Sequence, residues 1–498
     1  MTVAELLSRA GVSVGSGKLS NEKLQMAPTG VFYDSREVID GGVFVAVRGT
    51  RFNGAAFAND ARARGAAVAV SEEAQPLDAS LPWIRVPDTR VALAALAAAF
   101  YGNPSHALKV VGVTGTNGKT TTTYLIESIF TQAGIKTGRI SSISNRSGPN
   151  RPAKRSIRTT PESPDVQAWL GMMLEEKTNA CVMEVSSHAL ALRRVENVQF
   201  SAAVFTNLSR DHLEFHGDMD RYFAAKSRLF EMLPEDAPSV LNVDDKRGRE
   251  LALSVRRPVT YGIECSADVR PTRLDLAVDA TRLDVRTPRG MVHLESALVG
   301  RMAAYNLLAA TATSVALDVP FHGIEEGVRG LACVPGRMQT ITGPDDDVAV
   351  VVDFAHTAAA LRGLLEAVRI VSRGRVITVF GCGGDRDVAK RPLMGAVAAR
   401  LSDQVIVTSD NPRTERPLDI IADIERGIQQ MATPCIAIAD REEAIGRAIA
   451  EAAPSDMVVL AGKGHEKYQE IGPQAVPFDD AAIAQAALLR RRSSLRVG

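Results

Sequence analysis

Short β-branched runs and longer amphipathic segments alternate along most of this chain. The short runs predict buried strands, at 31–33, 43–47, 110–113, 180–185, 202–206, 348–354, 375–380, 404–408 and 457–461. Segments with helical spacing predict helices, at 58–64, 91–100, 124–130 and 222–226. Strands that alternate with helices are typical of a mostly parallel sheet covered on both faces. The pattern therefore predicts an α/β protein.

The 498 residues are enough for three domains, because a domain typically takes about 100–200 residues. Asn103-Pro104-Ser105 has the composition of a linker. Beyond it, strands and helices alternate in the pattern of a parallel sheet, and from about residue 338 the pattern of a second doubly wound unit begins. We predict domains at 1–106, 107–337 and 338–498.

The stretch LKVVGVTGTNGKTTTT at 108–123 joins a predicted strand, a glycine loop and a helix. Backbone N–H groups and the positive end of the helix dipole then face an anion, and the loop lysine reaches the terminal phosphates. Val113 stands where the strict phosphate-loop pattern has its first glycine, and an ordinary glycine turn is the alternative. We predict a nucleoside triphosphate site formed by Gly115, Thr116, Asn117, Gly118, Lys119, Thr120 and Thr121.

Composition excludes several classes of function. Lysine plus arginine and aspartate plus glutamate number 58 each, so the chain is formally neutral and nucleic acid is an unexpected partner. The five cysteines have no metal-binding spacing, and most lie in apolar runs that predict core positions in a reducing compartment. The start, MTVAELLSRAGV, is not a signal peptide, and the most apolar stretch, 91–100, is half of the ~20 residues that a membrane span needs. We expect a cytoplasmic monomer without membrane contact.

Polar residues follow two predicted strands of the central domain. Glu184 closes one strand, and Asp211 and His212 lie just beyond another. Ligands of α/β sheets bind at the carboxyl ends of strands, so Glu184 is well placed for a metal. Helix capping is the alternative, and it is as plausible as function for Asp211.

Four polar motifs follow four predicted strands of the last domain: AHT at 355–357, GCGGDRD at 381–387, DNPR at 410–413 and GKGHE at 462–466. Because the strands are parallel, these motifs predict one site in a crevice, which includes His356. Gly381-x-Gly383 suggests a dinucleotide site, but Arg386 occupies the place of the third glycine, so we reject it.

Two loops of the first domain suit a diphosphate or a sugar. They are Asp34-Ser35-Arg36 and residues 48–54, which combine hydroxyls, arginines and glycines. A plain surface turn is the alternative at both.

Taken together, these motifs resemble the Mur ligase family, and most closely its members that add meso-diaminopimelate. The matching stretches run through nearly the whole chain: DSR at 34–36, GVTGTNGKTTTT at 112–123, TTP at 159–161, EVSSHAL at 184–190, FTNLSRDHLEFHGDM at 205–219, YFAAK at 222–226, PGRM at 335–338, AHT at 355–357, FGCGGDRD at 380–387, KRPLMGA at 390–396, TSDNPRTE at 408–415 and AGKGHEKYQ at 461–469.

The resemblance implies a UDP-binding N-terminal domain, a central ATPase and a Rossmann-like C-terminal domain. It also implies a reaction: ATP phosphorylates the D-glutamate side-chain carboxylate of UDP-MurNAc-dipeptide, and the amine of meso-diaminopimelate attacks the acyl phosphate to form an amide.

Site residues follow from the same resemblance. It implies catalytic Lys119, Lys226, His212 and His356, and Mg²⁺ ligands Thr120, Glu184, His212 and Lys226, with Lys226 carbamylated. It implies contacts to the UDP substrate from Ser35, Thr159, Thr160, Ser186 and Arg194. It implies acceptor contacts from Arg386, Asp410, Asn411, Arg413, Gly462 and Glu466.

Several positions depart from the family pattern, most of them around the bound substrate. They are Ser141-Ser142, Arg158, Leu192, Gln339, Phe354, Ala358 and Ala359. A related ligase that joins another carboxylate or another amino acid, such as L-lysine, is therefore one alternative. A nucleotide-gated binding protein without catalysis is another, which ADP release dependent on both substrates would exclude.

Overall fold

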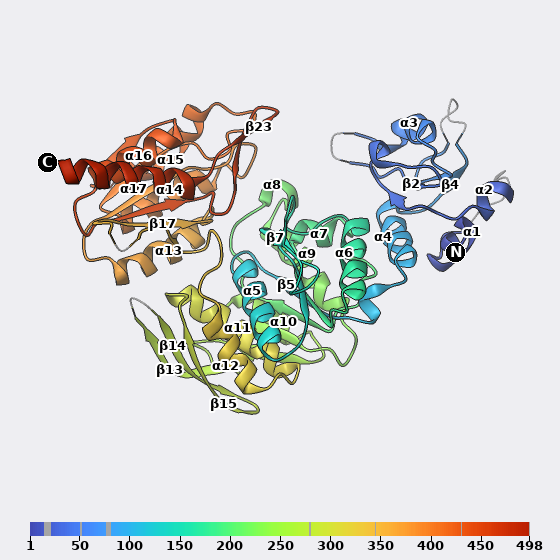
Figure 1. The fold of residues 1–498 in the computed structure, drawn as a ribbon, viewed down its shortest axis with the longest axis horizontal. Coiled ribbons are helices and arrows are strands. Elements are labelled where there is room, and N and C mark those ends of the chain that lie inside the picture. Colours follow the sequence, from blue (N-terminus) through green and yellow to red (C-terminus); the bar gives the residue numbers. More distant parts are fainter. Residues whose placement is uncertain are drawn as a thin grey trace. The chain divides into compact units, whose positions relative to one another are not determined.

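The computed structural model describes residues 1–13, 21–49, 52–75, 81–277, 280–343, 345–429 and 431–497. Thr50 and Arg51, in the second of the two predicted sugar-binding loops, lie outside the described residues. The chain forms two compact units, one of residues 1–114, 135–203 and 225–238, the other of residues 115–134, 204–224 and 239–498. Figure 1 labels the elements along the chain.

The first sheet is parallel, and its order is β1-β2-β3-β4. Its strands are β1 (Val31–Phe32), β2 (Val43–Val45), β3 (Val68–Ser71) and β4 (Trp83–Arg85). The accompanying helices are α1 (Val3–Arg9), α2 (Asn21–Gln25), α3 (Ala58–Ala63) and α4 (Thr89–Phe100). The apolar side chains of α1 and α4 pack with those of the strands in one core.

The second sheet has the order β12-β11-β10-β5-β9-β6. Its strands are β5 (Lys109–Thr114), β6 (Thr137–Ile140), β9 (Ala180–Glu184), β10 (Ala202–Phe205), β11 (Ser239–Asn242) and β12 (Pro258–Tyr261). The helices of this region are α5 (Lys119–Gln132), α6 (Ser163–Glu175), α7 (Ser187–Ala191), α8 (Leu213–His216), α9 (Met219–Glu231), α10 (Lys246–Ala252), α11 (Arg301–Ala316) and α12 (Phe321–Gly330). A small hairpin joins β7 (Ser144–Asn145) to β8 (Lys154–Arg155).

A separate antiparallel sheet interrupts the alternation expected over 107–337. It consists of β13 (Arg270–Leu276), β14 (Thr281–Thr287) and β15 (Gly290–Ser296). Along β14 every second side chain is buried, including Leu283 and Val285. The alternation of strands and helices predicted over 107–337 does not extend through this segment, because its period of two gives strands with only one buried face. The predicted fold class, with a mostly parallel sheet, is unaffected.

The third sheet is parallel except for its first strand, and its order is β16-β17-β21-β18-β19-β20. Its strands are β16 (Gln339–Thr340), β17 (Ala349–Asp353), β18 (Val376–Phe380), β19 (Gln404–Val407), β20 (Cys435–Ala437) and β21 (Met457–Ala461), and a hairpin follows as β22 (Tyr468–Ile471) and β23 (Gln474–Pro477). The helices are α13 (Ala358–Val371), α14 (Lys390–Leu401), α15 (Pro417–Ile428), α16 (Arg441–Glu451) and α17 (Asp480–Val497).

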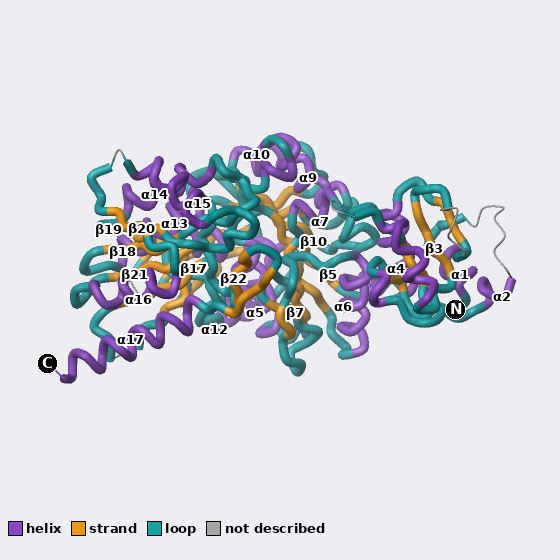
Figure 2. The backbone as a smooth tube through the Cα atoms, turned by 90° about the horizontal axis from the view of Figure 1, so that it is seen from above, coloured by secondary structure: helices purple, strands orange, loops and turns teal. Residues whose placement is uncertain are grey.

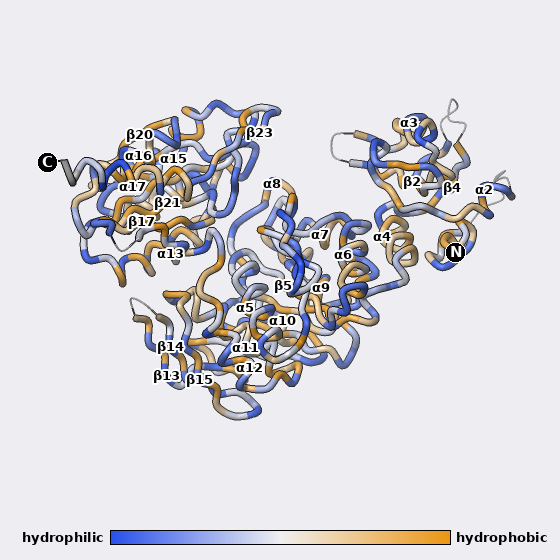
Figure 3. The backbone as a smooth tube through the Cα atoms, viewed as in Figure 1, coloured by the Kyte–Doolittle hydropathy of each residue, from blue (hydrophilic) through white to orange (hydrophobic). Residues whose placement is uncertain are grey.

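Both faces of this third sheet are covered by helices, as Figure 2 shows. Val351 of β17 packs with α13, α14 and α15, whereas its neighbours Val350 and Val352 pack with α16 and α17. Successive side chains of a strand point to opposite faces, so a sheet between two helical layers needs apolar residues at every position. The hydrophobic colour along β17 and β21 in Figure 3 follows from this.

The elements predicted from the sequence are confirmed at every strand and helix named above, within a few residues at the ends. The cysteine prediction is only partly right. Cys181 and Cys382 are buried, but Cys265 and Cys435 are half-buried and Cys333 is exposed. Among the helices of the described ranges, none has both the length and the apolarity needed to cross a bilayer.

Candidate active site

The predicted phosphate loop follows β5 directly and ends where α5 begins at Lys119. Gly118 precedes the helix with a φ of 86°. A Cβ on Gly115 would lie 1.9 Å from Thr206 Oγ1, and a Cβ on Gly118 would lie 2.4 Å from Asn306 Oδ1. Both positions therefore exclude a side chain, which leaves backbone to line the loop.

Neighbouring polar groups hold this loop in place. The Thr116 N–H donates to the backbone oxygen of Asn207 at 2.8 Å, and the Asn117 N–H donates to Asn207 Oδ1 at 3.0 Å. Thr206 Oγ1 donates to the Asn117 carbonyl at 2.6 Å. The loop is thus preorganised by the segment that follows β10, about 90 residues further along the chain.

Lys119 is half-buried, and its ammonium lies over its own loop. Its Nζ donates to the carbonyls of Gly115 and Thr116, at 3.0 and 2.8 Å. Thr120 is buried, and its hydroxyl accepts a hydrogen bond of 2.9 Å from Arg337. The Arg337 guanidinium also lies 4.6 Å from the centre of the Phe354 ring. Arg337 lies in the PGRM motif, but the motif alone gave it no role.

Asp211 is a buried carboxylate beside three groups that can carry positive charge. Its Oδ2 lies 3.3 Å from His212 Nε2 and 3.5 Å from His356 Nε2, and its Oδ1 lies 3.8 Å from Lys390 Nζ. Burial raises the pKa of Asp211, but the hydrogen bond and charge of His356, together with His212 and Lys390, lower that pKa well below its ordinary value overall. Asp211 therefore brings together two predicted catalytic residues, His212 and His356. The sequence had left the role of Asp211 open between function and helix capping.

The capping alternative for Asp211 is wrong. The residue that precedes α8 is His212, which has a left-handed φ of 54°. Among the described residues, the one backbone N–H found to donate to the Asp211 carboxylate is that of His212, at 3.0 Å, and it does not belong to the first turn of the helix. His356 is oriented from its other side, where Nδ1 lies 2.8 Å from the Phe354 carbonyl.

Glu184 is 1% exposed at the end of β9, and Ser142 holds it. The Ser142 N–H and hydroxyl approach Glu184 Oε1 at 2.9 and 3.1 Å. Capping does not explain Glu184, since Ser186 is the residue that caps α7. Ser142 is one of the departures from the family pattern, and it serves to orient a predicted metal ligand.

Three of the five residues predicted for the UDP substrate form one network. The Thr160 hydroxyl accepts the Ser186 N–H at 3.0 Å, and the Thr160 carbonyl accepts from Arg194 Nη1 at 3.2 Å. Arg194 also pairs with Glu162 at 2.9 Å. Thr159 is the half-buried neighbour of Thr160, whereas Ser35 lies in the loop after β1.

The residues predicted for the acceptor converge at the carboxyl ends of β18, β19 and β21. Asn411 Nδ2 donates to Glu466 Oε2 at 2.9 Å, and a Cβ on Gly462 would lie 2.6 Å from Asp410 Oδ2. A Cβ on Gly383 would lie 2.9 Å from Arg413 Nη1 and 3.7 Å from Arg386 Cγ, so both arginines border the same point.

Arg413 is held at both ends of its guanidinium. Its Nε pairs with Glu470 at 2.6 Å, and its Nη1 donates to the Gly384 carbonyl at 2.8 Å. Its φ of 52° is left-handed, a strained conformation for arginine. Glu470 was missed in the sequence, because its role depends on the hairpin β22–β23 folding back onto the DNPR loop.

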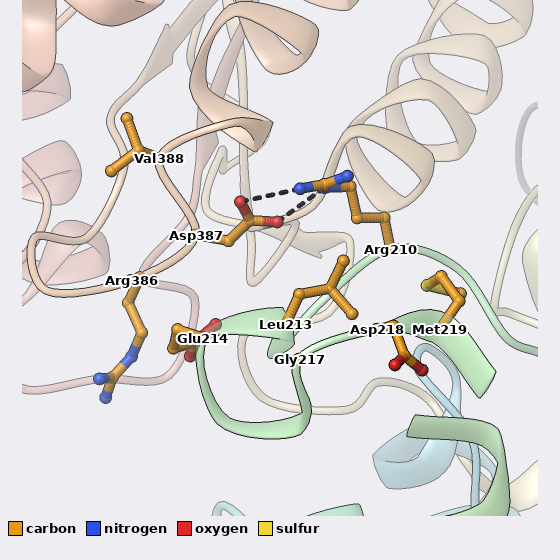
Figure 4. A pocket seen from close by; sticks show the side chains of 9 residues that line it. All are labelled: Arg210, Leu213, Glu214, Gly217, Asp218, Met219, Arg386, Asp387 and Val388. Atoms are coloured by element: carbon orange, nitrogen blue, oxygen red, sulfur yellow. Dashed lines mark hydrogen bonds and ion pairs between the residues drawn. The ribbon is translucent and has the colours of Figure 1, made fainter. Parts of the chain in front are cut away.

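A pocket borders this region, lined by Arg210, Leu213, Glu214, Gly217, Asp218, Met219, Arg386, Asp387 and Val388. Arg210 and Asp387 face each other across it through two hydrogen bonds of 2.7 and 3.2 Å, whereas Arg386 extends away from Asp387 (Figure 4). This ion pair joins the segment before α8 to the GDRD motif. Asp387 was predicted only as part of the GCGGDRD motif, without a role of its own, and Arg210 was given no role.

The predicted metal ligands are divided between the two compact units. Glu184 and Lys226 belong to one unit, and Thr120 and His212 to the other. Within the described ranges, no three His, Cys, Asp or Glu side chains gather closely enough to hold a metal ion by themselves. The metal site therefore stays a prediction.

Three family models match this chain. The Mur ligase middle domain matches residues 113–314, the Mur ligase glutamate ligase domain matches 336–464, and the catalytic domain of the Mur ligase family matches 28–101. A UDP-N-acetylmuramoyl-L-alanyl-D-glutamate–2,6-diaminopimelate ligase of Gloeobacter violaceus is 45% identical over 99% of both chains. The chain belongs to the Mur ligase family.

Other relatives of this Mur ligase agree with that assignment. The ligase of the same description from Solibacter usitatus is 44% identical over 98% of both chains. A solved structure, also of a UDP-N-acetylmuramoyl-L-alanyl-D-glutamate–2,6-diaminopimelate ligase, has a TM-score of 0.67 at 31% identity and covers 99% of both chains. A MurF ligase from Thermotoga maritima in complex with ADP shares the fold, with a TM-score of 0.64 at 19% identity. The predicted three-domain α/β architecture is confirmed.

Proposed function

We propose that this Mur ligase joins meso-diaminopimelate to UDP-N-acetylmuramoyl-L-alanyl-D-glutamate, with ATP as the second substrate, in peptidoglycan synthesis. The observation that carries the proposal is the convergence of Arg386, Arg413, Asn411 and Glu466 at the ends of neighbouring strands. Arginine suits bidentate recognition of a carboxylate, and Glu466 can accept from an ammonium. Relatives over 40% identical along the whole chain carry the corresponding name.

The phosphate loop is the proposed ATP site. Its glycines leave room for phosphate against the backbone, and the first turn of α5 directs N–H groups and the helix dipole at it. Lys119 exchanges its two carbonyl partners for phosphate oxygens when the nucleotide binds. The γ-phosphoryl group passes to the glutamate side-chain carboxylate, ADP leaves, and the acceptor amine then displaces phosphate from the carbonyl carbon and loses a proton.

Thr120, Glu184, His212 and Lys226 are the proposed Mg²⁺ ligands. The hydroxyl of Thr120 and the carboxylate of Glu184 are oxygen donors of the kind that Mg²⁺ prefers, and Ser142 already orients that carboxylate. Lys226 fits this set only as a carbamate. When bound, the ion would offset the negative charge of the phosphates.

The substrate glutamate is proposed to reach this centre from a UDP moiety bound near Ser35, Thr159, Thr160, Ser186 and Arg194. The network of Thr160, Ser186 and Arg194 supports a preformed site. We also propose domain boundaries near residues 106 and 337 and a monomeric cytoplasmic enzyme. One family match ends at residue 101 and the next begins at 113, which supports the first boundary. The middle match ends at residue 314 and the last begins at 336, which supports the second.

Product analysis tests the function directly. The protein is incubated with ATP, Mg²⁺, the UDP-MurNAc-dipeptide and one amino acid at a time, and the product is identified by mass spectrometry. We expect a product with meso-diaminopimelate, and ADP release that requires both other substrates. No product with any amino acid, or an equal yield with L-lysine, would contradict the proposal.

Arg413→Ala is expected to weaken kcat/KM for meso-diaminopimelate, mainly through KM, and to leave the KM for ATP unchanged. The loss should be about 2–5 kcal/mol, the range for truncating one partner of a buried hydrogen-bonded charge pair. Glu470 would also lose its guanidinium partner, so we expect the DNPR loop to become less ordered.

Arg416→Ala is the matched control, because Arg416 lies three residues away and is 78% exposed. Its kinetics should equal those of the wild type. A parallel rise in the KM for ATP in Arg413→Ala would show that Arg413 acts on the whole fold rather than on the acceptor.

A further inference from the structure

Lys463 carries a fully buried ammonium group beside the proposed acceptor residues. It follows Gly462 at the end of β21, and its side chain is 0% exposed. Its Nζ lies 3.0 Å from Asn411 Oδ1 and 2.9 Å from Glu466 Oε2. A buried charge is costly unless it is paired and hydrogen-bonded. Both hydrogen-bonding partners belong to the proposed acceptor site, and the Tyr468 ring, whose centre lies 5.8 Å from Nζ, adds a cation–π contact.

Lys463 also determines which way the Asn411 amide points. Asn411 Oδ1 accepts from Lys463 Nζ and from the Glu470 N–H, the latter at 3.0 Å. A reversed amide would place its NH₂ group against these two donors, which costs two hydrogen bonds. Asn411 Nδ2 is therefore directed at Glu466 Oε2, and Glu466 receives two hydrogen bonds on one oxygen.

The ion pair changes what Glu466 can attract. The Glu466 side chain is 19% exposed, so a ligand can reach it, but Lys463 offsets its charge. A ligand that ends in a bare ammonium would meet a neutral pair, with the two arginines that border Gly383 close by. A ligand that ends in an ammonium and a carboxylate can use the remaining hydrogen-bonding capacity of Glu466 together with the guanidinium donors of the two arginines, although Glu470 already offsets the charge of Arg413.

We propose that Lys463 is a specificity-determining residue of this site. It orients Asn411 and Glu466 and offsets the charge of Glu466, so that the site selects an acceptor with a zwitterionic far end over one with only an ammonium there. This inference rests on the proposed function, in which meso-diaminopimelate is the zwitterionic acceptor and L-lysine is the acceptor with the bare ammonium.

Lys463→Met tests the proposal through the ratio of the two kcat/KM values, for meso-diaminopimelate and for L-lysine. We expect kcat/KM for meso-diaminopimelate to fall at least about tenfold, mainly through KM. We expect the ratio of the two kcat/KM values to fall at least about fivefold, because an unpaired Glu466 attracts any cation, including the bare ammonium of L-lysine. The KM for ATP should not change. Arg491→Met is the matched control, because it removes a partly buried ion pair with Asp347, 2.7 Å long, near the amino end of β17.

Lys463→Met leaves a carboxylate unpaired, so a second variant keeps the test decisive if it fails to fold. In Lys463→Gln the positive charge is absent, but the side-chain amide can still donate a hydrogen bond to Glu466, so the half-buried carboxylate keeps a donor. We expect this variant to unfold at nearly the wild-type temperature and to show the same loss of preference for the zwitterionic acceptor.

The failures of the two proposals can be distinguished. If a folded Lys463 variant loses activity by the same factor with both amino acids, Lys463 is merely structural and only this inference is overturned. If the wild type makes no product with either amino acid, the proposed function is overturned. In that case, calorimetric titration of each amino acid into the wild type and the variant decides the inference. The inference is overturned if the ratio of the two affinities is the same in both proteins, or if neither amino acid binds.

Discussion

Lys119→Ala is expected to abolish amide formation while the protein stays folded. The Lys119 side chain is half-buried and its ammonium donates to two loop carbonyls, so its loss opens no cavity in a core. Its proposed role is to stabilise the charge on the phosphoryl group during transfer. Removing one such preorganised donor costs about 100–1,000-fold in kcat, and loss of a full charge should cost at least as much.

ADP release and product mass measure this effect, and thermal unfolding checks the fold. We expect an unfolding temperature close to that of the wild type and weaker binding of ATP. Lys109→Ala is the matched control, because Lys109 is an exposed lysine at the start of β5 in the same strand–loop–helix unit. Near-normal turnover by a folded Lys119→Ala protein would overturn the assignment of the phosphate loop.

Lys226→Ala is expected to be nearly inactive, because we propose that Lys226 is carbamylated and contributes an oxygen ligand. The Lys226 side chain is 1% exposed on α9, so it is not a solvated surface lysine. An ammonium cannot bind Mg²⁺, whereas a carbamate resembles the carboxylates that do. A short carboxylic acid such as acetate should restore part of the rate in Lys226→Ala by occupying the vacated volume.

The modification itself can be observed without any assay of activity. After incubation with ¹³C-bicarbonate, carbon NMR of the wild type should show a carbamate signal that is missing from Lys226→Ala. Lys246→Ala is the control, since Lys246 is exposed at the start of α10, and it should keep both the signal and the activity. A wild-type protein that is active but has no carbamate signal would contradict the proposal.

Much of the fold could be predicted from the sequence because the patterns that specify it are local. The apolar runs at β17, β18, β19 and β21 predict buried strands, since each face of this sheet is covered. The phosphate loop is likewise local: two glycines, a lysine and a threonine lie within residues 115–120, where a strand ends and a helix begins. The convergence of the residues at the proposed acceptor site was also predictable in outline, because parallel strands bring their carboxyl ends to one edge.

Only the tertiary structure decided how these side chains are oriented. Ser142 holds Glu184 across 42 residues of chain, Lys463 holds Asn411 across 52, and Arg337 reaches Thr120 across 217. Asp211 could not be told from a helix cap until His356 was placed beside it. Periodicity and turn chemistry depend on neighbours along the chain, whereas the partner of a buried charge is determined by packing between elements distant in sequence. For this reason the sequence by itself determined the strands, the glycine loop and the edge of the sheet where the chemistry is proposed, and the tertiary structure decided which charges meet there.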